Sequence, residues 1–574
     1  MSPDSIVFGA AGFIGRSLVA ELLGQGRHVA AALRPGSEAR LTSWLSSRGT
    51  SLDRLTVVHC DITEAGLGLP AAGFDGVRDV YNSAAAFAWG LAAETAYQVN
   101  VTGALNVLEW AAERPGLRRL VHITGYRASV KENSSSGGYE SSKLAADIAV
   151  TARAAELGVP LTIANPSTVI GPGQYIGLAD IVADLWHGRL PALPGGRDTF
   201  VPVVTIDYFA AFLATLPERT ETAGQSYTVL DPATPNLPDL VRLLADHLGV
   251  RAPRLQIPVG VIRRLPRALT RAEPETLTFL SDDRYDTSAA DAHARVAGLR
   301  MPPVEESLRD WADHLVASRF GTAATAGSGR FRDGTWLAGD QEHPEHVLLH
   351  GVPVDSDSWT EVATALHPSG PGEPGWAALR ADLPGLGRSA PSPKSLVDWL
   401  EELMRPVTSR PVLVAHSLAC EPAVRYALTH PDRISRLVLV APAFLQDRAS
   451  LLSRSPLAVP ALRRIPAARL AALLGIPEGT AADSAAANLG RPGAARRVVR
   501  ALRAASSPAR RAEAQNLLRQ LKVPVSVLAG EADPLRTAAG YPVTVIAGAG
   551  HYPQISHPAE VARALTPLAA SLRP

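Results

Sequence analysis

The feature that most constrains the fold is a regular alternation of short apolar segments with longer helical patterns, which occurs twice along the chain. Such alternation predicts a parallel β-sheet with helices on both faces, and therefore an α/β fold class for each half. In the first series the expected strands are residues 6–8, 29–33, 55–58, 77–81, 120–123 and 161–164, with helices such as 15–23 and 96–112 between them. In the second series they are residues 346–350, 378–381, 412–415, 437–440, 525–528 and 543–546.

The two series are separated by residues 321–330, which contain the run Gly-Thr-Ala-Ala-Thr-Ala-Gly-Ser-Gly and are expected to be a flexible linker. With 574 residues, of which 46% are apolar, the chain is long enough for several domains with cores of their own. We expect an N-terminal domain over residues 1–320 and a C-terminal domain over residues 331–574. Residues 444–520 interrupt the second series with helical, arginine-rich sequence. They are expected to form a helical cap on the C-terminal domain.

Charge and composition narrow the classes of partner and compartment. Lys plus Arg number 56 and Asp plus Glu number 55, so neither nucleic acid nor an anionic membrane is an expected partner. Cys60 and Cys420 lie far apart and do not form a metal-binding pair, so no metal is expected. No secretory signal precedes the first strand and no apolar run reaches about 20 residues. A cytoplasmic location is therefore expected.

Gly9, Gly12 and Gly15 stand between the first expected strand and the first expected helix. A tight turn there needs residues without a Cβ atom, because the diphosphate of a dinucleotide must approach main-chain N–H groups closely. The N-terminus of the following helix also attracts negative charge. The position of these glycines therefore predicts a dinucleotide site.

The residue after the second strand indicates which nucleotide is bound. A domain that prefers NAD usually has an acidic residue there for the ribose 2′-hydroxyl, whereas this chain has Arg34, with Arg40 nearby. An arginine suits a 2′-phosphate, so NADP(H) is expected in preference to NAD; the alternative is an ordinary surface arginine. Asp61, after the third strand, is expected to accept a hydrogen bond from the adenine amino group.

A Tyr-x-x-x-Lys pair, Tyr139 and Lys143, offers redox chemistry. At this spacing both side chains share one face of a helix. A nearby ammonium favours the phenolate form, so that Tyr139 can pass a proton to or from a carbonyl oxygen as hydride moves at carbon. Taken alone, such a pair more often belongs to an ordinary surface helix.

Residues 5–317 resemble the extended short-chain dehydrogenase/reductase family, which includes NAD-dependent epimerases and dehydratases. The motifs that carry the resemblance are Gly9-Ala-Ala-Gly-Phe-Ile-Gly15, Cys60-Asp-Ile62, Val80-Tyr-Asn-Ser-Ala-Ala85, Asn100-Val-Thr-Gly-Ala-Leu-Asn106, Tyr139-Glu-Ser-Ser-Lys143 and Asn165-Pro-Ser-Thr-Val-Ile-Gly-Pro172. The resemblance implies a doubly wound Rossmann sheet and a smaller substrate-binding lobe from about residue 174, with residues 201–207 returning to the sheet. It also implies that Ser83 and Ala84 line the cofactor and that Pro166 and Val169 approach the nicotinamide. The expected cofactor contacts are Gly9, Gly12, Phe13, Ile14, Gly15, Arg34, Asp61, Ile62, Ser83, Ala84, Lys143, Pro166 and Val169.

One position departs from this family. Members usually have two hydroxyl residues after the fifth strand, and the second polarises the substrate carbonyl. Here Thr124 takes the first place and Gly125 the second, followed by Tyr126. Either Thr124 or Tyr126 reaches the substrate, or the redox step is impaired; we expect Thr124 to act.

The segment Ala415-His-Ser-Leu-Ala419 follows an apolar strand and precedes a helical stretch, which is the position of a nucleophile elbow. The flanking residues must be small because the turn is strained, and alanine is the smallest choice after glycine. Asp533 and His551 follow the next expected strands, so Ser417, Asp533 and His551 occur in the order found in α/β-hydrolases. His551 is expected to take the proton of Ser417, while Asp533 fixes the imidazole tautomer.

Residues 331–574 resemble the α/β-hydrolase family in further motifs, His350-Gly-Val-Pro353 and Asp382-Leu-Pro-Gly-Leu-Gly-Arg-Ser389. The resemblance implies that the N–H groups of Val352 and Leu418 bind the oxyanion. His416 and Cys420, beside the nucleophile, are expected to be packing residues. A serine nucleophile favours esters, thioesters or activated ketones.

The two motif sets predict a bifunctional enzyme that reduces a carbonyl or oxidises a hydroxyl with NADP(H) and hydrolyses an acyl ester or thioester. The substrate is expected to be a small molecule, either free or bound to a carrier protein or coenzyme A. The arginines of the cap suit such a partner, although a solvated helix face is the simpler interpretation; they are Arg463, Arg464, Arg496, Arg497, Arg500, Arg503, Arg510 and Arg511. In the alternative, only the hydrolase half is catalytic, with acyl transfer or lactone formation in place of hydrolysis, and the reductase half is structural or senses the cofactor.

Overall fold

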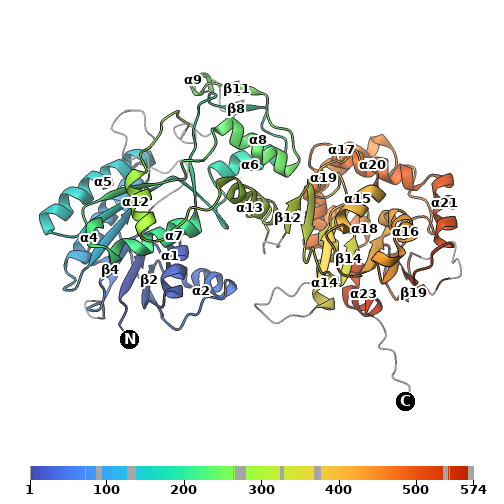
Figure 1. Cartoon of the computed structure of the whole chain (residues 1–574), viewed down its shortest axis with the longest axis horizontal. Coiled ribbons are helices and arrows are strands. Elements are labelled where there is room, and N and C mark those ends of the chain that lie inside the picture. The colour runs from blue at the N-terminus through green and yellow to red at the C-terminus, as the bar shows by residue number, and fades with distance from the viewer. Residues whose placement is uncertain are drawn as a thin grey trace, which may run out of the picture. The chain divides into compact units, whose positions relative to one another are not determined.

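The computed structural model describes residues 2–70, 73–85, 93–125, 138–262, 264, 280–323, 329–367, 377–533, 535, 541 and 543–566 (Figure 1). The chain divides into two compact units. The first comprises Met1–Val182, Pro191–Leu244 and Pro253–Leu315, and the second comprises Ala183–Leu190, Ala245–Ala252 and Val316–Pro574. Each unit is built on its own β-sheet.

The sheet of the first unit has seven strands, all parallel, in the order β10-β6-β5-β4-β1-β2-β3. The strands are β1 (Ser5–Phe8), β2 (Val29–Leu33), β3 (Leu55–His59), β4 (Asp79–Asn82), β5 (Arg119–Ile123), β6 (Leu161–Pro166) and β10 (Ser226–Val229). The order runs outward in both directions from β1 and β4. The connections therefore diverge between these two strands, and a crevice opens there at their carboxyl ends.

Helices cover both faces of this sheet, as the alternating pattern predicts (Figure 1). On one face lie α1 (Phe13–Gly24), α2 (Glu38–Ser47) and α7 (Ile206–Thr215), and on the other α4 (Gly103–Ala112) and α5 (Gly138–Leu157). Successive strand residues point to opposite faces, so Val7 packs with the first group and Phe8 with the second. The helix expected at 96–112 is divided into α3 (Ala93–Tyr97), a wide π-helical turn η2 (Gln98–Thr102) and α4.

The prediction that residues 201–207 return to the large sheet is wrong. β9 (Val203–Thr205) instead pairs with β7 (Thr168–Ile170) in a separate two-stranded sheet, and β10 takes the edge position beside β6. Pro202 precedes β9 and has no N–H to donate to a longer ladder. Further elements of the first half are η1 (Ala65–Gly68), α6 (Leu178–Trp186), β8 (Ala192–Pro194), η4 (Leu216–Glu218), η5 (Thr220–Thr222), α8 (Leu237–Leu248), β11 (Leu255–Ile257), α9 (Val259–Ile262), α12 (Ser288–Val296) and α13 (Val304–Ala317).

The sheet of the second unit has eight strands in the order β12-β13-β15-β14-β16-β17-β18-β19. The strands are β12 (Gly329–Arg332), β13 (Thr335–Ala338), β14 (His346–Leu349), β15 (Ala378–Ala381), β16 (Val412–His416), β17 (Arg436–Val440), β18 (Val525–Gly530) and β19 (Val543–Ile546). β14 to β19 are parallel, while β12 and β13 form an antiparallel hairpin that the sequence did not indicate. β12 begins at Gly329, inside the expected linker; residues 324–328 lie outside the described part of the chain.

Helices also cover both faces of the second sheet. α14 (Thr360–Leu366) and α23 (Pro558–Leu565) pack together on one face, and α15 (Leu396–Met404) and α16 (Cys420–Thr429) on the other. Short turns are η6 (Ser356–Trp359), η7 (Ser417–Ala419), η8 (Pro431–Arg433), η9 (Pro456–Ala458) and α22 (Pro553–Ser556). No described helix combines the length and the apolar character that a bilayer crossing requires.

The region between β17 and β18 is helical, as the sequence of residues 444–520 predicts. Its helices are α17 (Val459–Arg463), α18 (Ala467–Leu474), α19 (Thr480–Leu489), α20 (Ala494–Ala505) and α21 (Pro508–Leu518). α20 contacts η7, the turn that begins at Ser417, and α21 contacts α16. The helical insertion is thus adjacent to the turn that carries the expected nucleophile.

Candidate active sites

The glycine turn after β1 is packed so closely that side chains are excluded from it. Gly9 has a φ of +77°, and a Cβ atom there would lie 2.8 Å from the main-chain N and Cα of Ala84. A Cβ atom on Gly15 would overlap the carbonyl oxygen of Gly9 and lie 2.8 Å from Oγ of Ser83. The turn therefore rests directly on the chain that leaves β4, at the crevice between β1 and β4. The N–H groups of Gly9 and Gly12 bond the carbonyls of Ala32 and Gly9, whereas the N–H groups of the first turn of α1 remain for a phosphate.

Hydrogen bonds fix the other wall of this crevice. Ser83 donates from Oγ to the carbonyl of Phe8 at 2.7 Å, and the N–H of Ala84 donates to the side chain of Asn82 at 3.2 Å. Phe13 and Ile14, in the first turn of α1, are partly buried. The structure thus brings these predicted cofactor residues to one place.

Arg34 and Asp61 lie at the carboxyl ends of β2 and β3, where a bound adenosine would extend. Both are exposed, and Arg34 is near enough to act on the charge of Asp61. The hydroxyl and N–H of Thr63 donate to Oδ1 of Asp61 at 2.7 and 2.9 Å, and these bonds lower the pKa of Asp61. Ile62 is partly buried beside them, with its Cδ1 atom against Gly103.

Arg16, in the first turn of α1, is a candidate cofactor contact that was not predicted from the sequence. Its guanidinium lies 4.7 Å from the ring centre of Trp44 and donates to the carbonyl of Pro172 at 3.2 Å. It also lies close enough to Arg40 for their charges to interact. Its place directly after the glycine turn was the only signal that the sequence offered.

Lys143 lies on α5 and is buried, which lowers the pKa of its ammonium to about 8. Tyr139 belongs to the same helix, but its side chain lies outside the described part of the structure, as does Tyr126. Pro166 ends β6 and Val169 lies in β7, and both are buried.

The hydroxyl of Thr124, at the end of β5, is engaged inside the protein. Thr124 donates from Oγ1 to the side-chain oxygen of Asn165 at 3.2 Å and accepts the N–H of Gly125. Asn165 in turn donates to Oγ of Ser226 at 2.8 Å. A substrate carbonyl would have to replace Asn165 as the acceptor before Thr124 could polarise it.

In the second unit, Ser417, His551 and Asp533 form one chain of hydrogen bonds. Oγ of Ser417 lies 2.9 Å from Nε2 of His551, and Nδ1 of His551 lies 2.6 Å from Oδ2 of Asp533. With Nδ1–H donating to the carboxylate, Nε2 is left to accept the serine proton. The three residues come from the ends of β16, β18 and β19, and the carboxyl ends of parallel strands share one edge of the sheet.

The chain bends sharply at Ser417, whose φ is 53°, in the left-handed region that non-glycine residues seldom occupy. Ala415 and Ala419 on either side are fully buried, so larger residues would not fit there. Gly530 is equally constrained, because a Cβ atom on it would overlap the carbonyls of Ala549 and Gly550. The missing side chain at Gly530 lets the segments that carry Asp533 and His551 come together.

The N–H groups that are predicted to bind the oxyanion lie in segments next to Ser417. A Cβ atom on Gly351 would lie 2.8 Å from Cβ of Ser417, so the loop after β14 passes directly over the elbow. The carbonyl of Val352 is held by the hydroxyl of Tyr552 at 2.9 Å. Within the described residues, the N–H groups of Val352 and Leu418 donate to no other main-chain group.

Two residues that contact the triad were not predicted to have a role there. Gln446, buried at the start of the helical insertion, donates from its side-chain amide to Oδ2 of Asp533 and to the Asp533 carbonyl, the latter at 3.2 Å. His416, expected only to pack, donates from Nε2 to the carbonyl of His551 at 2.8 Å, and burial lowers its pKa well below the usual value. Cys420, by contrast, is buried and donates its thiol to the carbonyl of Ala415 at 3.1 Å, consistent with packing.

A buried ionic cluster holds the loop after β14. Asp382 accepts from the N–H groups of Ser356 and Arg388, each at 2.7 Å, and the Arg388 side chain also bonds Asp357 at 2.7 Å. Asp355 accepts from Ser484 and Asn488 of α19, each at 2.7 Å. Buried charges are stable only when paired and hydrogen-bonded in this way. The cluster ties both the loop after β14, which is the predicted oxyanion loop, and the helical insertion to the sheet.

The arginines of the helical insertion divide into two groups. Arg497 donates to the Gly385 carbonyl, Arg511 to the carbonyls of Ala443 and Gln446, and Arg510 bonds Glu421 at 2.9 Å. Arg497 and Arg511 thus hold loops near Ser417, and Arg510 holds α16. The remaining ones are exposed: Arg463, Arg464, Arg496, Arg500 and Arg503.

Two features define the class of protein. The first sheet is parallel and has a glycine turn where its connections diverge, and the second sheet carries a Ser–His–Asp chain of hydrogen bonds. The chain contains an NAD(P)-binding domain of the epimerase/reductase type and an α/β-hydrolase domain. Residues 7–213 match the NAD-binding family model described as "Male sterility protein", and residues 347–564 match the model described as "Alpha/beta hydrolase family".

Individual relatives resemble one half or the other. A 3β-hydroxysteroid dehydrogenase/Δ5→4-isomerase of Mycobacterium tuberculosis is 25% identical over 45% of this chain and 73% of its own length. A pimeloyl-[acyl-carrier protein] methyl ester esterase of Photorhabdus laumondii is 30% identical over 18% of this chain and 39% of its own. Among solved structures, the terminal R domain from the myxalamid PKS-NRPS biosynthetic pathway aligns with a TM-score of 0.47 and 20% identity, over 57% of this chain and 93% of that domain.

Proposed function

We propose that this chain is a bifunctional enzyme, in which the hydrolase domain cleaves an acyl ester or thioester and the N-terminal domain interconverts a carbonyl and an alcohol with NADP(H). The observation that carries the proposal is the hydrogen-bond chain from Ser417 through His551 to Asp533. An isolated serine hydroxyl is a weak nucleophile, and a neutral imidazole held at this distance is what activates it.

In the hydrolase half, Oγ of Ser417 attacks the acyl carbon while Nε2 of His551 takes its proton. Asp533 stabilises the resulting imidazolium, and the N–H groups of Val352 and Leu418 bind the oxyanion. His551 then returns the proton to the leaving alcohol or thiol, which leaves an acyl-serine. Water, deprotonated by His551, attacks this ester and releases the acid with Ser417 restored.

In the N-terminal half, the excluded Cβ positions at Gly9 and Gly15 fit a diphosphate, and Arg34 fits a 2′-phosphate. NADPH, when bound, supplies a hydride to the carbonyl carbon. Tyr139 donates the proton to the carbonyl oxygen, and the ammonium of Lys143 stabilises the phenolate that remains. The alcohol is oxidised by the reverse of these proton movements.

The hydrolase half is tested with p-nitrophenyl acetate and a fluorophosphonate probe. Ser417→Ala is expected to abolish covalent labelling and to lower ester turnover by at least about 1,000-fold. Tyr139→Phe is the matched control, because it removes a hydroxyl from the other domain and leaves ester turnover unchanged. Undiminished turnover in Ser417→Ala would exclude the proposed nucleophile.

The cofactor preference is tested by fluorescence titration with NADPH and NADH. Arg34→Ala is expected to weaken NADPH binding by about tenfold or more, since a charge-assisted hydrogen bond contributes about 1.5–3 kcal/mol, and to leave NADH binding unchanged. Arg153→Ala, which removes a partly exposed arginine of α5 that pairs with Glu109 and Glu156, serves as the control. Equal losses for both nucleotides would contradict a 2′-phosphate site.

A second candidate has only the hydrolase half catalytic, and the engagement of Thr124 by Asn165 favours it. Consumption of NADPH with a panel of aldehydes and ketones, abolished by Tyr139→Phe, would exclude this alternative. Acyl transfer or lactone formation is distinguished from hydrolysis by adding alcohol or thiol acceptors and identifying the products.

The substrate class is tested with thioesters. Exposed leucines accompany the exposed arginines of the helical insertion; they are Leu451, Leu452, Leu457 and Leu473. A surface with both characters suits an acyl group carried on a phosphorylated cofactor or an acidic carrier protein. Acyl-coenzyme A is expected to be hydrolysed with a lower KM than the matching N-acetylcysteamine thioester, and Arg500→Glu with Arg503→Glu should remove the difference.

A further inference from the structure

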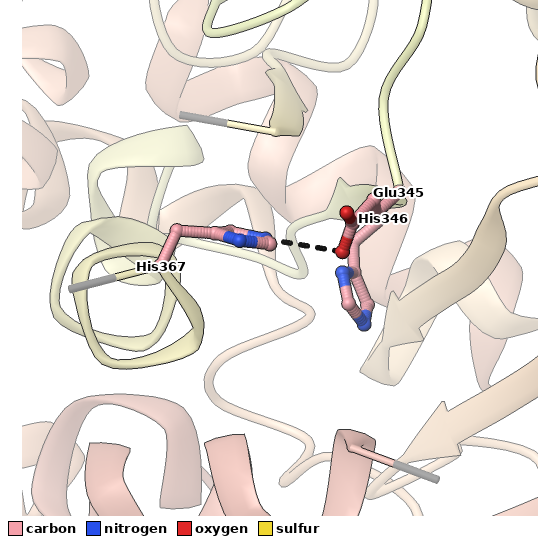
Figure 2. A group of neighbouring side chains, drawn as sticks. All are labelled: Glu345, His346 and His367. Carbon is pink, nitrogen blue, oxygen red and sulfur yellow. Dashed lines mark ion pairs between the residues drawn. The ribbon is translucent and has the colours of Figure 1, made fainter. Parts of the chain in front are cut away.

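Three potential ligand residues meet at the amino-terminal end of a strand in the second sheet. The triad lies at the opposite, carboxyl ends of the strands. His346 begins β14 and Glu345 directly precedes it, and His367 directly follows the last residue of α14. One ligand atom from each residue lies within 4.8 Å of the others. Figure 2 shows the His367 ring reaching toward the Glu345 carboxylate, with the His346 ring beside it.

An ion pair alone does not account for this arrangement. Nε2 of His367 and Oε2 of Glu345 are 4.0 Å apart, at the limit of such a contact. His346 is only 6% exposed, and neither of its ring nitrogens makes a well-formed hydrogen bond to any described residue. Buried polar atoms in proteins are nearly always bonded, so His346 has capacity for a ligand.

The surroundings of His346 suit a metal ligand. The carbonyl of Leu565 faces the ring closely enough to affect its protonation. A metal-binding imidazole commonly directs one nitrogen to a carbonyl and the other to the ion.

We propose that Glu345, His346 and His367 bind a Zn²⁺ ion, with water in the fourth position. Two imidazoles and a carboxylate form a ligand set that zinc accepts readily. Bound ligand atoms in a tetrahedral site lie about 3.4 Å apart, so the three residues must close in slightly. The Glu345 side chain is 67% exposed, so it can move toward the two histidines. The main chain of Glu345 stays in place, because its N–H donates to the Ala377 carbonyl at 2.6 Å.

The proposed ion has a structural role and is independent of ester chemistry. His346 pairs in register with Val412 at the start of β16, and Ser417 follows the other end of that strand. Five residues of strand separate the two positions by about 16 Å. The ion would fasten the end of α14 to the start of β14. The guanidinium of Arg436 lies near His346, and its positive charge disfavours a cation there. This guanidinium donates a hydrogen bond to the Leu565 carbonyl.

The experiment uses the full chain, stripped with a chelator and dialysed against Zn²⁺ or Co²⁺. We expect one tightly bound equivalent of zinc by elemental analysis, a Co²⁺ absorption spectrum typical of four-coordination, and a higher thermal unfolding temperature with zinc. His367→Gln and Glu345→Gln should each weaken zinc binding by at least about tenfold and abolish the thermal shift. Turnover of p-nitrophenyl acetate in both variants shows that the domain has folded.

Two controls locate the ion. His343→Gln changes an exposed histidine two residues before Glu345 on the same segment and should leave zinc binding unchanged. His551→Gln tests whether zinc binds instead at the triad. Zinc binding that is absent in the wild-type protein, unchanged in His367→Gln, or lost in His551→Gln would overturn the proposal, and none of these results bears on the proposed hydrolase or reductase activity.

Discussion

Nε2 of His416 donates a hydrogen bond to the main-chain carbonyl of His551 at 2.8 Å, so the residue before Ser417 holds the segment that carries His551. The two rings also pack together, with centres 5.1 Å apart. Because the acceptor is a carbonyl, Nε2 must carry the proton, and this fixes the tautomer of His416.

His416→Phe removes this bond while keeping a ring of similar size. A net hydrogen bond contributes about 1 kcal/mol, so we expect kcat/KM for p-nitrophenyl acetate to fall about fivefold. His416→Gln, whose amide can still donate, should retain more activity. Fluorophosphonate labelling rates should follow the same order, and a His416→Phe enzyme as active as wild type would show that the bond does not position His551.

Gly351→Ala tests how closely the oxyanion loop passes over the elbow. The added methyl would lie 2.7 Å from Nδ1 of His416 and 2.8 Å from Cβ of Ser417, closer than such atoms approach, so the loop must shift. Removing an oxyanion donor costs about 100- to 1,000-fold in kcat in a known protease, and a loss near that range is expected here. Gly550→Ala is the control, since open space surrounds its Cβ position beside His551. Similar kcat values for the two variants would contradict this account of the loop.

Gln446→Glu tests the amide that donates to Asp533. The substitution replaces a donor with a second carboxylate, so the two acids repel each other and Asp533 no longer orients His551 as well. Ester turnover should fall by at least about tenfold. Gln446→Met, which removes the bond without adding charge, should lose less. Equal activity of the Glu and Met variants would exclude electrostatic positioning by residue 446.

The sequence predicted the parts of the sites that depend on order along the chain. Ser417, Asp533 and His551 each follow a strand of an apolar series, and parallel strands bring their carboxyl ends to one edge, so their meeting could be foreseen. Gly9 and Gly15 could be interpreted in the same way, because a turn between the first strand and the first helix has few other uses.

The parts that the sequence did not predict depend on contacts across long separations. Gln446 belongs to no motif, and it reaches Asp533 only because the helical insertion folds back. The partner of His416 is a main-chain carbonyl, which leaves no trace in side-chain identity. The hairpin begins at Gly329, inside the expected linker of residues 321–330, because Gly329 ends a run of small residues and a strand-like pattern appears only from Phe331 onward.

Gly15→Ala tests the glycine turn. The added methyl would overlap the Gly9 carbonyl and crowd Oγ of Ser83, so the turn must open and lose its phosphate-binding shape. NADPH affinity, measured by fluorescence titration, should fall by about 100-fold or more, since several charge-assisted bonds to phosphate are disturbed together. Gly24→Ala, at the other end of α1 and in open space, should bind NADPH as wild type does. Wild-type affinity in Gly15→Ala would place the nucleotide elsewhere.

The buried ammonium of Lys143 predicts a pH limit for the reductase reaction. Burial lowers the pKa of Lys143 to about 8, so the ammonium that we propose to assist Tyr139 is present below pH 8 and lost above it. We expect kcat/KM for NADPH-dependent reduction, which reports the free enzyme, to fall as the pH rises through 8. Lys143→Arg stays charged and should lose this limb of the profile, at a lower overall rate. The same pKa shift also affects stability. Between pH 8 and 10.5 the unfolded chain still binds a proton that the folded state has released. The free energy of unfolding should therefore rise with pH across that window in wild type and not in Lys143→Met. A limb at pH 8 that persists in Lys143→Arg would assign it to another group.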